Sequence, residues 1–150
     1  MPQIQPIHLD EQLCFQVYSA NKKFNHFYQQ ALKPFDLTYP QYIAMLTLWQ
    51  YAPLSVKQLG EYLHLDSGTL TPLLKRLESH GWISRSRSRS DERTVVIQLT
   101  DKAKEQQNVV YGHINSCFDI LGLTPDEKET CMQAMTTLEQ KLDLYNDPQV

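Results

Sequence analysis

A cysteine near the amino terminus is the residue of this 150-residue chain with the clearest capacity for redox chemistry. Cys14 precedes Tyr18 by one helical turn, and Tyr28 follows ten residues after Tyr18. A thiol can pack in a protein core as a small apolar residue. As a thiolate it can instead attack the O–O bond of a hydroperoxide and form a sulfenic acid. The residues around Cys14 are compatible with both interpretations, core packing and oxidant detection.

The other two cysteines, Cys117 and Cys131, make the total odd, which argues against a structural disulfide framework. No apolar run approaches the roughly 20 residues that cross a bilayer, and residues 1–10 lack the basic and apolar stretches of a secretory signal. We therefore predict a cytoplasmic protein with no membrane partner. Its thiols start reduced in that compartment, so any disulfide would be a switching event.

Basic residues gather in one part of the chain, although the net charge is −3. They are Lys75, Arg76, Arg85, Arg87, Arg89 and Arg93, with few acids between them. Acidic residues cluster instead after residue 118. The middle of the chain therefore fits an anionic partner, and the end of the chain does not.

The histidines do not favour a metal site. His8, His26, His64, His80 and His113 show no paired ligand spacing with cysteine or acid, so we predict neither a metal nor another cofactor. A thiol peroxidase would also use a reactive cysteine, but the chain has no thioredoxin-like βαβ pattern. We predict that the protein is not an enzyme.

Helical periodicity marks both ends of the chain. Apolar residues keep helical spacing over about residues 9–33, and Pro34 is expected to end that helix because proline restricts the residue before it. Over about residues 101–145 the pattern predicts two more helices. Thr124 and Glu127 form a capping box at the start of the second.

Three shorter helices and a hairpin are predicted between these ends. The stretch "YPQYIAMLTLWQY" forms the first helix, and Ser55 with Gln58 has the spacing of a capping box that opens the second. The third helix begins at an N-cap of Asp66 or Ser67, and Gly81 terminates it.

The third of these helices has two unlike faces. Its leucines repeat with the spacing of a buried stripe, and hydroxyls and cations occupy the opposite face. Pro72 costs little if the helix begins near Thr69, and it removes a backbone hydrogen bond if the helix begins at Asp66. Both starts remain open.

The stretch "WISRSRSRSDERTVVIQLT" changes from a helical to an alternating period. In a strand its three arginines at 85, 87 and 89 share one face. The returning strand "VVIQL" has an apolar face, and the turn between the strands is expected at residues 90–92.

Two short helices, a tight turn and an arginine-rich hairpin together predict a winged helix-turn-helix. Its second helix fits a DNA major groove, and its wing fits an adjoining minor groove that attracts arginine. The residues predicted to contact DNA are Ser67, Thr69, Thr71, Pro72, Lys75 and Arg76 on the helix and Arg87, Arg89 and Arg93 on the wing. In a purely structural interpretation, the helix covers the core and the Arg-Ser stretch is a charged edge strand. That interpretation does not explain why cations gather on two adjoining elements.

The segments "LDSGTLTPLLKRLE" and "DERTVVIQLT" resemble the MarR family of bacterial transcription regulators, and "QLCFQVY" with "LTYPQY" resembles its organic-hydroperoxide-sensing branch. The resemblance covers nearly the whole chain. It implies a single, mainly α domain over 1–150, with a winged lobe at about 39–99 and a small β wing. The helices at about 9–33 and 101–145 are implied to interlock in a homodimer on a pseudo-palindromic double-stranded operator. Asp91 is implied to position the tip arginine Arg93.

The same resemblance assigns Cys14 as the sensing cysteine. It implies that Tyr28 and Tyr39 reach this thiol across the dimer and that Tyr18 lies near it. A position near a helix start supports the assignment, because free N–H groups and the helix dipole favour a thiolate. Phe15, Phe24 and Phe27 would supply an apolar lining that favours organic hydroperoxides.

Cys117 corresponds to the resolving cysteine of two-cysteine members, which condenses with the sulfenic acid of the other subunit. That bridge requires Cα atoms within about 7 Å, and therefore a helix movement. A mixed disulfide between Cys14 and a small thiol is the other possible end point. Cys131 is interpreted as a core or interface residue.

The predicted function is that of a repressor that leaves its operator when an organic hydroperoxide oxidises Cys14. The rival is a repressor of the same fold that responds to a small aromatic or phenolic ligand, with Cys14 merely packed.

Overall fold

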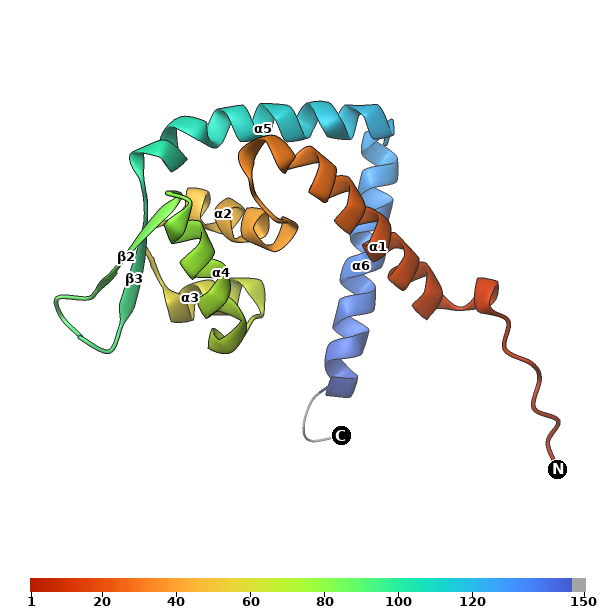
Figure 1. Ribbon diagram of the computed structural model, residues 1–150. Helices are drawn as coiled ribbons and strands as arrows, with labels where there is room; N and C mark the ends of the chain where they lie inside the picture. The colour runs from red at the N-terminus through yellow and green to blue at the C-terminus, as the bar shows by residue number, and fades with distance from the viewer. Residues whose placement is uncertain (147–150) are drawn as a thin grey trace. The chain divides into compact units, whose positions relative to one another are not determined.

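The computed structural model describes residues 1–146 as two compact units, Met1–His113 and a second unit that begins at Ile114 (Figure 1). In chain order the elements are η1 (Leu9–Glu11), α1 (Leu13–Ala31), η2 (Lys33–Phe35), α2 (Tyr39–Tyr51), β1 (Leu54–Ser55), α3 (Val56–Leu63), α4 (Ser67–Ser79), β2 (Ile83–Arg87), β3 (Val95–Leu99), α5 (Asp101–Leu121) and α6 (Pro125–Asn146). Helix α5 begins in the first unit and ends in the second. None of the described helices is long and apolar enough to span a bilayer. The predicted fold class, a mainly helical winged helix-turn-helix, is confirmed.

The first helix is shorter than its periodicity predicts. Residues Leu9–Glu11 form a separate 3-10 turn, and Gln12 has an extended conformation with φ −96° and ψ 126°. Helix α1 therefore starts at Leu13, so that Cys14 is its second residue. Apolar spacing does not report such a break, because the spacing continues across it.

Reciprocal capping starts three of the helices. The side chains of Ser55 and Gln58 each accept from the other residue's backbone N–H, at 3.0 and 2.9 Å, as predicted. Thr124 and Glu127 do the same at the start of α6, at 3.2 and 2.9 Å. A further capping box, between Thr38 and Gln41, opens α2, and its T-x-x-Q spacing was visible in the sequence.

The start of α4 resolves the two possibilities for Pro72. Asp66 is the N-cap and accepts from the backbone N–H of Thr69 at 2.8 Å, and the helix runs from Ser67. Pro72 is therefore the sixth helical residue, and the hydrogen bond that an N–H at this position would make to the Gly68 carbonyl cannot form.

The strands form a three-stranded antiparallel sheet in the order β1-β3-β2. Figure 1 shows the hairpin of β2 and β3. The two-residue strand β1 was not predicted, since two residues carry no period. The hairpin register pairs Arg85 with Ile97 and Arg87 with Val95. Residues directly opposite each other share a face, so the strand arginines lie on the same face as the apolar residues of β3. Arg89 lies beyond the end of β2, so its predicted place in that strand is wrong.

The core of the first unit is built from the end of α1, from α2, from the helix-turn-helix of α3 and α4, from the sheet and from the first half of α5. Its fully buried apolar side chains include Leu32, Met45, Leu48, Leu59, Leu70, Leu74, Leu77, Trp82, Ile83, Ile97 and Val110. The indole N–H of Trp49 donates to the Ala103 carbonyl at 2.9 Å in this core. The first turn of α5 is thereby bound to α2.

Helix α6 contrasts with this core. Among its described side chains, 125–145, Leu138 alone is partly covered, and every other one is exposed. The exposed side chains include large apolar ones, namely Met132, Met135, Leu142, Leu144 and Tyr145. An isolated helix is marginal in water, so α6 needs a partner surface to bury its apolar residues.

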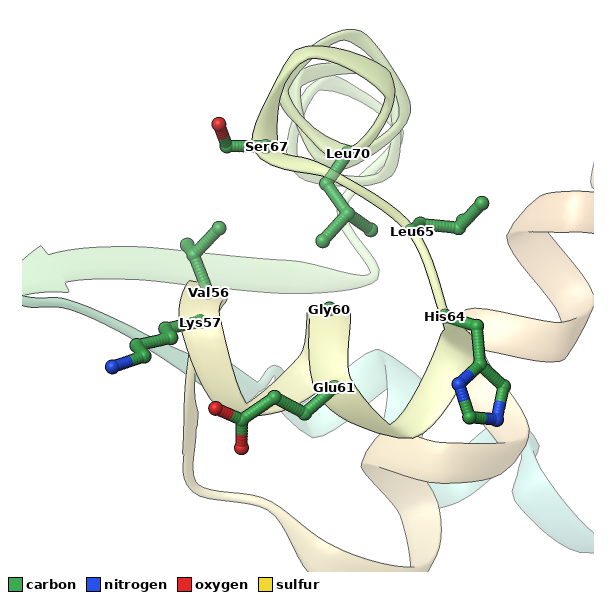
Figure 2. Close-up of a pocket in the computed structure, with 8 residues that line it drawn as sticks. All are labelled: Val56, Lys57, Gly60, Glu61, His64, Leu65, Ser67 and Leu70. Carbon is green, nitrogen blue, oxygen red and sulfur yellow. The ribbon is translucent and has the colours of Figure 1, made fainter. Parts of the chain in front are cut away.

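Gly60 marks the closest approach between α3 and the turn that leads into α4 (Figure 2). A Cβ atom here would lie 2.8 Å from the Leu65 carbonyl oxygen and 3.2 Å from Cδ1 of Leu70. Figure 2 shows the Leu70 side chain pointing toward Gly60. A side chain at this position would therefore force the turn between α3 and α4, or Leu70, to move.

Gly60→Ala should destabilise the protein, because a backbone oxygen has to move to admit the methyl group. Overpacking of this kind costs about 1–3 kcal/mol, which outweighs the gain in helix propensity of about 1 kcal/mol or less. The matched control is Gly112→Ala in α5, where an added Cβ meets no described atom within 4 Å. Thermal unfolding should show a lower midpoint for Gly60→Ala than for Gly112→Ala. Equal midpoints would contradict the close approach.

Candidate nucleic-acid interface and thiol site

The outward face of α4 brings together the helix residues that were predicted to contact DNA. Ser67, Thr69, Thr71, Pro72, Lys75 and Arg76 are all exposed, whereas Leu70, Leu74 and Leu77 are buried. The backbone N–H of Thr69 holds the pKa of Asp66 below its usual range, so this N-cap stays ionised at neutral pH. The Thr71 hydroxyl donates to the Ser67 carbonyl at 2.7 Å. The helix thus starts with an ordered turn that presents hydroxyls, and cations follow one to two turns later.

A hollow of about 620 Å³ lies between α3 and the start of α4 (Figure 2). Val56 and Leu70 form apolar parts of its lining, and Lys57 and Glu61 of α3 add opposite charges. Figure 2 shows the Ser67 hydroxyl pointing away from Gly60. Lys57 was not among the predicted residues, because this exposed cation close to the start of α4 lies on α3, outside the two elements in which basic residues gather.

The wing tip is ordered by hydrogen bonds to its own backbone. The Asp91 carboxylate accepts from the backbone N–H of Arg93 at 3.0 Å and from the Thr94 hydroxyl at 3.3 Å. The Arg87 guanidinium donates to the Glu92 carbonyl at 2.7 Å. Asp91 therefore holds the backbone of Arg93 and leaves that exposed side chain at the tip of the hairpin.

Cys14 lies in the first turn of α1 and is exposed. The interpretation of Cys14 as core filler is thus wrong for the described chain. Gln12, the N-cap, makes no side-chain capping bond, so the cap leaves backbone N–H groups of this turn to other acceptors. Tyr18, one turn along, is 64% exposed. The thiol is accessible to a reactant or to a second chain.

Tyr28 and Tyr39 lie together at the other end of α1. Their rings stack with centroids 4.3 Å apart and planes 7° from parallel, and Tyr42 and Phe27 contact Tyr28 at 5.6 and 5.1 Å. Burial raises the pKa of the Tyr28 phenol far above its ordinary value, with smaller contributions from Tyr42 and Tyr39. Tyr28 therefore remains a neutral phenol, able to donate a hydrogen bond, throughout the physiological range.

The helix keeps Cys14 and Tyr28 of one chain apart. They are fourteen residues apart on one uninterrupted α-helix, which at 1.5 Å per residue separates them by about 21 Å. Fourteen residues also make nearly four turns, so both residues lie within about 40° of the same helix face. A contact between this thiol and this phenol requires a second chain.

The other two cysteines lie on the carboxyl-terminal helices. Cys117 is half-exposed on the part of α5 that belongs to the second unit. Cys131 is exposed on α6, so it does not belong to the core of the described chain. Both thiols are therefore at surfaces.

Comparison with known proteins gives a consistent result. A family model described as transcriptional regulator SarA/Rot matches residues 26–110. The chain is 42% identical to the organic hydroperoxide resistance transcriptional regulator of Bacillus subtilis over 138 residues, 90% of this chain and 90% of that protein. It is 44% identical to the HTH-type regulator TtmR of Methylorubrum extorquens over 137 residues, 91% of this chain and 70% of that protein.

Similar solved structures include AbfR of Staphylococcus epidermidis. Reduced AbfR bound to DNA superposes with a TM-score of 0.82 at 41% identity, over 91% of this chain and 94% of that one. AbfR is also known overoxidised on DNA and in a disulfide form.

The burial of Tyr28 predicts a pH dependence of stability. Below the ordinary tyrosine pKa, of about 10, both native and unfolded chains keep the proton. Above it the unfolded chain ionises and the native chain does not, so the free energy of unfolding falls as pH rises. Tyr28→Phe should lose less stability than wild type between about pH 9 and about pH 11, by on the order of 1 kcal/mol.

Urea unfolding at both pH values checks this prediction. Tyr145→Phe, at a position that is 79% exposed, controls for the loss of a phenol. Identical pH dependence in wild type and Tyr28→Phe would show that the Tyr28 phenol is not buried in solution.

Proposed function

The chain belongs to the SarA/Rot group of MarR-like transcriptional regulators, and we propose that it is a homodimeric repressor that organic hydroperoxides release from its operator by oxidising Cys14. The proposal gives it no catalytic turnover and places it in the cytoplasm with its DNA. The observation that carries the proposal is the position of an exposed thiol and a buried phenol at opposite ends of one face of α1.

An antiparallel pair of α1 helices would complete the thiol site. If a two-fold axis passes near Asn21, midway between Cys14 and Tyr28, the thiol of each chain meets the phenol of the other. Tyr39 would arrive with Tyr28, because the two rings are stacked. Two phenol donors against one sulfur stabilise a thiolate, which is the reactive form. The aromatic side chains of Phe24 and Phe27 contact Tyr28 and would provide an apolar surface for an organic hydroperoxide.

The oxidation proceeds in two balanced steps. The Cys14 thiolate attacks the terminal oxygen of the hydroperoxide, an S–O bond forms, the O–O bond breaks, and the alcohol leaves after taking a proton. The thiolate of Cys117 from the other chain then attacks this sulfur, a disulfide forms, the S–O bond breaks, and the hydroxide leaves as water after taking a proton. The two thiols are oxidised and the hydroperoxide is reduced to an alcohol. The existence of a disulfide form of AbfR supports the second step in a protein 42% identical to this one.

The start of α5 would transmit the change to the DNA-binding lobe. The Thr100 hydroxyl donates to the Gly81 carbonyl at 2.6 Å, and the Lys102 ammonium donates to the His80 carbonyl at 2.8 Å. These carbonyls lie just after α4, so the first turn of α5 holds the end of the recognition helix. A displacement of α5 by a disulfide at Cys117 would therefore move α4, and half-sites one DNA turn apart tolerate little such movement.

The direct test measures operator binding by wild type, Cys14→Ser and Cys117→Ser before and after cumene hydroperoxide, with non-reducing gels alongside. Wild type should lose its operator and form a covalent dimer. Cys14→Ser should remain bound, and Cys117→Ser should form no crosslink between chains. Peroxide-dependent release by Cys14→Ser would refute the proposal, and release by an aromatic acid instead of peroxide would indicate a ligand-responsive repressor.

The antiparallel pairing of α1 makes a separate prediction. In a chain with Cys14, Cys117 and Cys131 all changed to serine, Asn21→Cys should be crosslinked to its partner by a short bifunctional maleimide. Lys23→Cys, about 200° around the helix, is the matched control and should react with far lower yield. Equal yields from the two variants would exclude a two-fold axis near Asn21.

A further inference from the structure

Arg85 lies on the inner face of the wing sheet, not on a face open to DNA. It pairs across the sheet with Ile97, which is fully buried, and its side chain is only 24% exposed. Burying a guanidinium beside apolar residues is costly unless a partner compensates its charge. The Arg-Ser alternation that predicts a row of equivalent arginines therefore contains one arginine in a different environment.

Glu78 of the recognition helix supplies the compensation. Its carboxylate accepts from the Arg85 guanidinium at 3.2 Å through one oxygen and from the Arg85 backbone N–H at 3.0 Å through the other. The hydrogen bond from the guanidinium holds the pKa of Glu78 below its usual range, so the pair is ionised at neutral pH. One carboxylate thus binds both the backbone and the side chain of β2 to the last turn of α4.

The contact between Glu78 and Arg85 lies at the base of the wing, far from its tip. The tip residue Asp91 is six residues beyond Arg85, or about 20 Å along an extended chain. A rotation of about 10° at the base would move the tip by about 3.5 Å, more than the length of a hydrogen bond. The position of the tip in a minor groove therefore depends on how firmly β2 is held against α4.

We propose that Glu78 and Arg85 are a positioning pair that sets the angle of the wing relative to the recognition helix, so that both grooves of the operator are read together. Neither side chain contacts DNA in this role. Arg87 is bound to the Glu92 carbonyl and also serves the shape of the wing, which leaves Arg89 and Arg93 for the minor groove.

Glu78→Gln separates this role from simple electrostatics, because the two predict changes in operator affinity of opposite sign. Removing an acid near DNA strengthens binding if only net charge matters. If Glu78 positions the wing, the variant should bind the operator at least about five-fold more weakly, and its log–log salt dependence should be shallower by about 0.9 for each phosphate that the wing no longer neutralises. Hydroxyl-radical protection should disappear from the flanking minor grooves and persist in the major grooves. The matched control is Glu105→Gln, the same change at an exposed position of α5.

All measurements use full-length reduced protein, so they do not depend on the chemistry of Cys14, and operator binding by wild type is the reference. A reversed pair, Glu78→Arg with Arg85→Glu, should restore part of the minor-groove protection that either single change removes.

Three results would overturn the proposal. One is tighter binding by Glu78→Gln together with weaker binding by Arg85→Gln, which would make Arg85 a direct DNA ligand. The second is loss of protection in both grooves with a clearly lower thermal midpoint, which would make the pair a general stabiliser. The third is unchanged protection in every variant.

Discussion

The stiffness of α1 is the constraint from which the proposed sensing mechanism follows. A continuous helix maintains a fixed distance of about 21 Å between the thiol at its start and the phenol near its end, and it keeps both on one face. No rearrangement of loops in a single chain brings the two groups together while the helix persists. A sensor built this way is incomplete in the monomer, and its reactive centre and its subunit interface are the same place. In the proposed mechanism, oxidation at this centre would alter how the two chains fit.

The DNA-binding lobe is joined to the start of α5 through a few hydrogen bonds. Thr100 and Lys102 hold the carbonyls that follow α4, and Trp49 of α2 holds the carbonyl of Ala103. The ammonium of Lys102 also lies 4.6 Å from the centre of the Trp82 ring. Recognition helix, wing base and first turn of α5 are therefore joined at one end. The opposite end of α4, which begins at Ser67, points its hydroxyl-bearing turn outward.

Much of this architecture could be predicted from local chemistry in the sequence. The capping boxes at Ser55 and Thr124 and the leucine stripe of α4 act within one or two helical turns, so short motifs are enough to identify them. The same kind of motif limits the N-cap of α4 to Asp66 or Ser67, and the structure selects Asp66. The stacking of Tyr28 on Tyr39 was not predicted, since no spacing rule joins residues on two helices. The family resemblance implied only that both phenols reach Cys14.

The features that were not predicted depend on the tertiary structure and not on local motifs. Strand alternation says which arginines share a face and does not say which face is covered. The inner position of Arg85 depends on the register with β3 and on a carboxylate seven residues away. The break at Gln12 is a change of backbone conformation, and the two-residue strand β1 is defined by its pairing with β3. Neither feature leaves a period in the sequence.

The uncovered apolar side chains of α6 have a consequence for how the protein is maintained in a cell. A newly made chain that has not found its partner displays methionine, leucine and tyrosine side chains along most of a long helix, and chaperones and proteases select such surfaces. Unassembled chains would be removed and assembled ones would persist, so the abundance of the regulator would follow its pairing. A fragment that retained α5 and α6 without the winged lobe would compete for partner chains. The resulting dimers would carry one DNA-binding lobe instead of two.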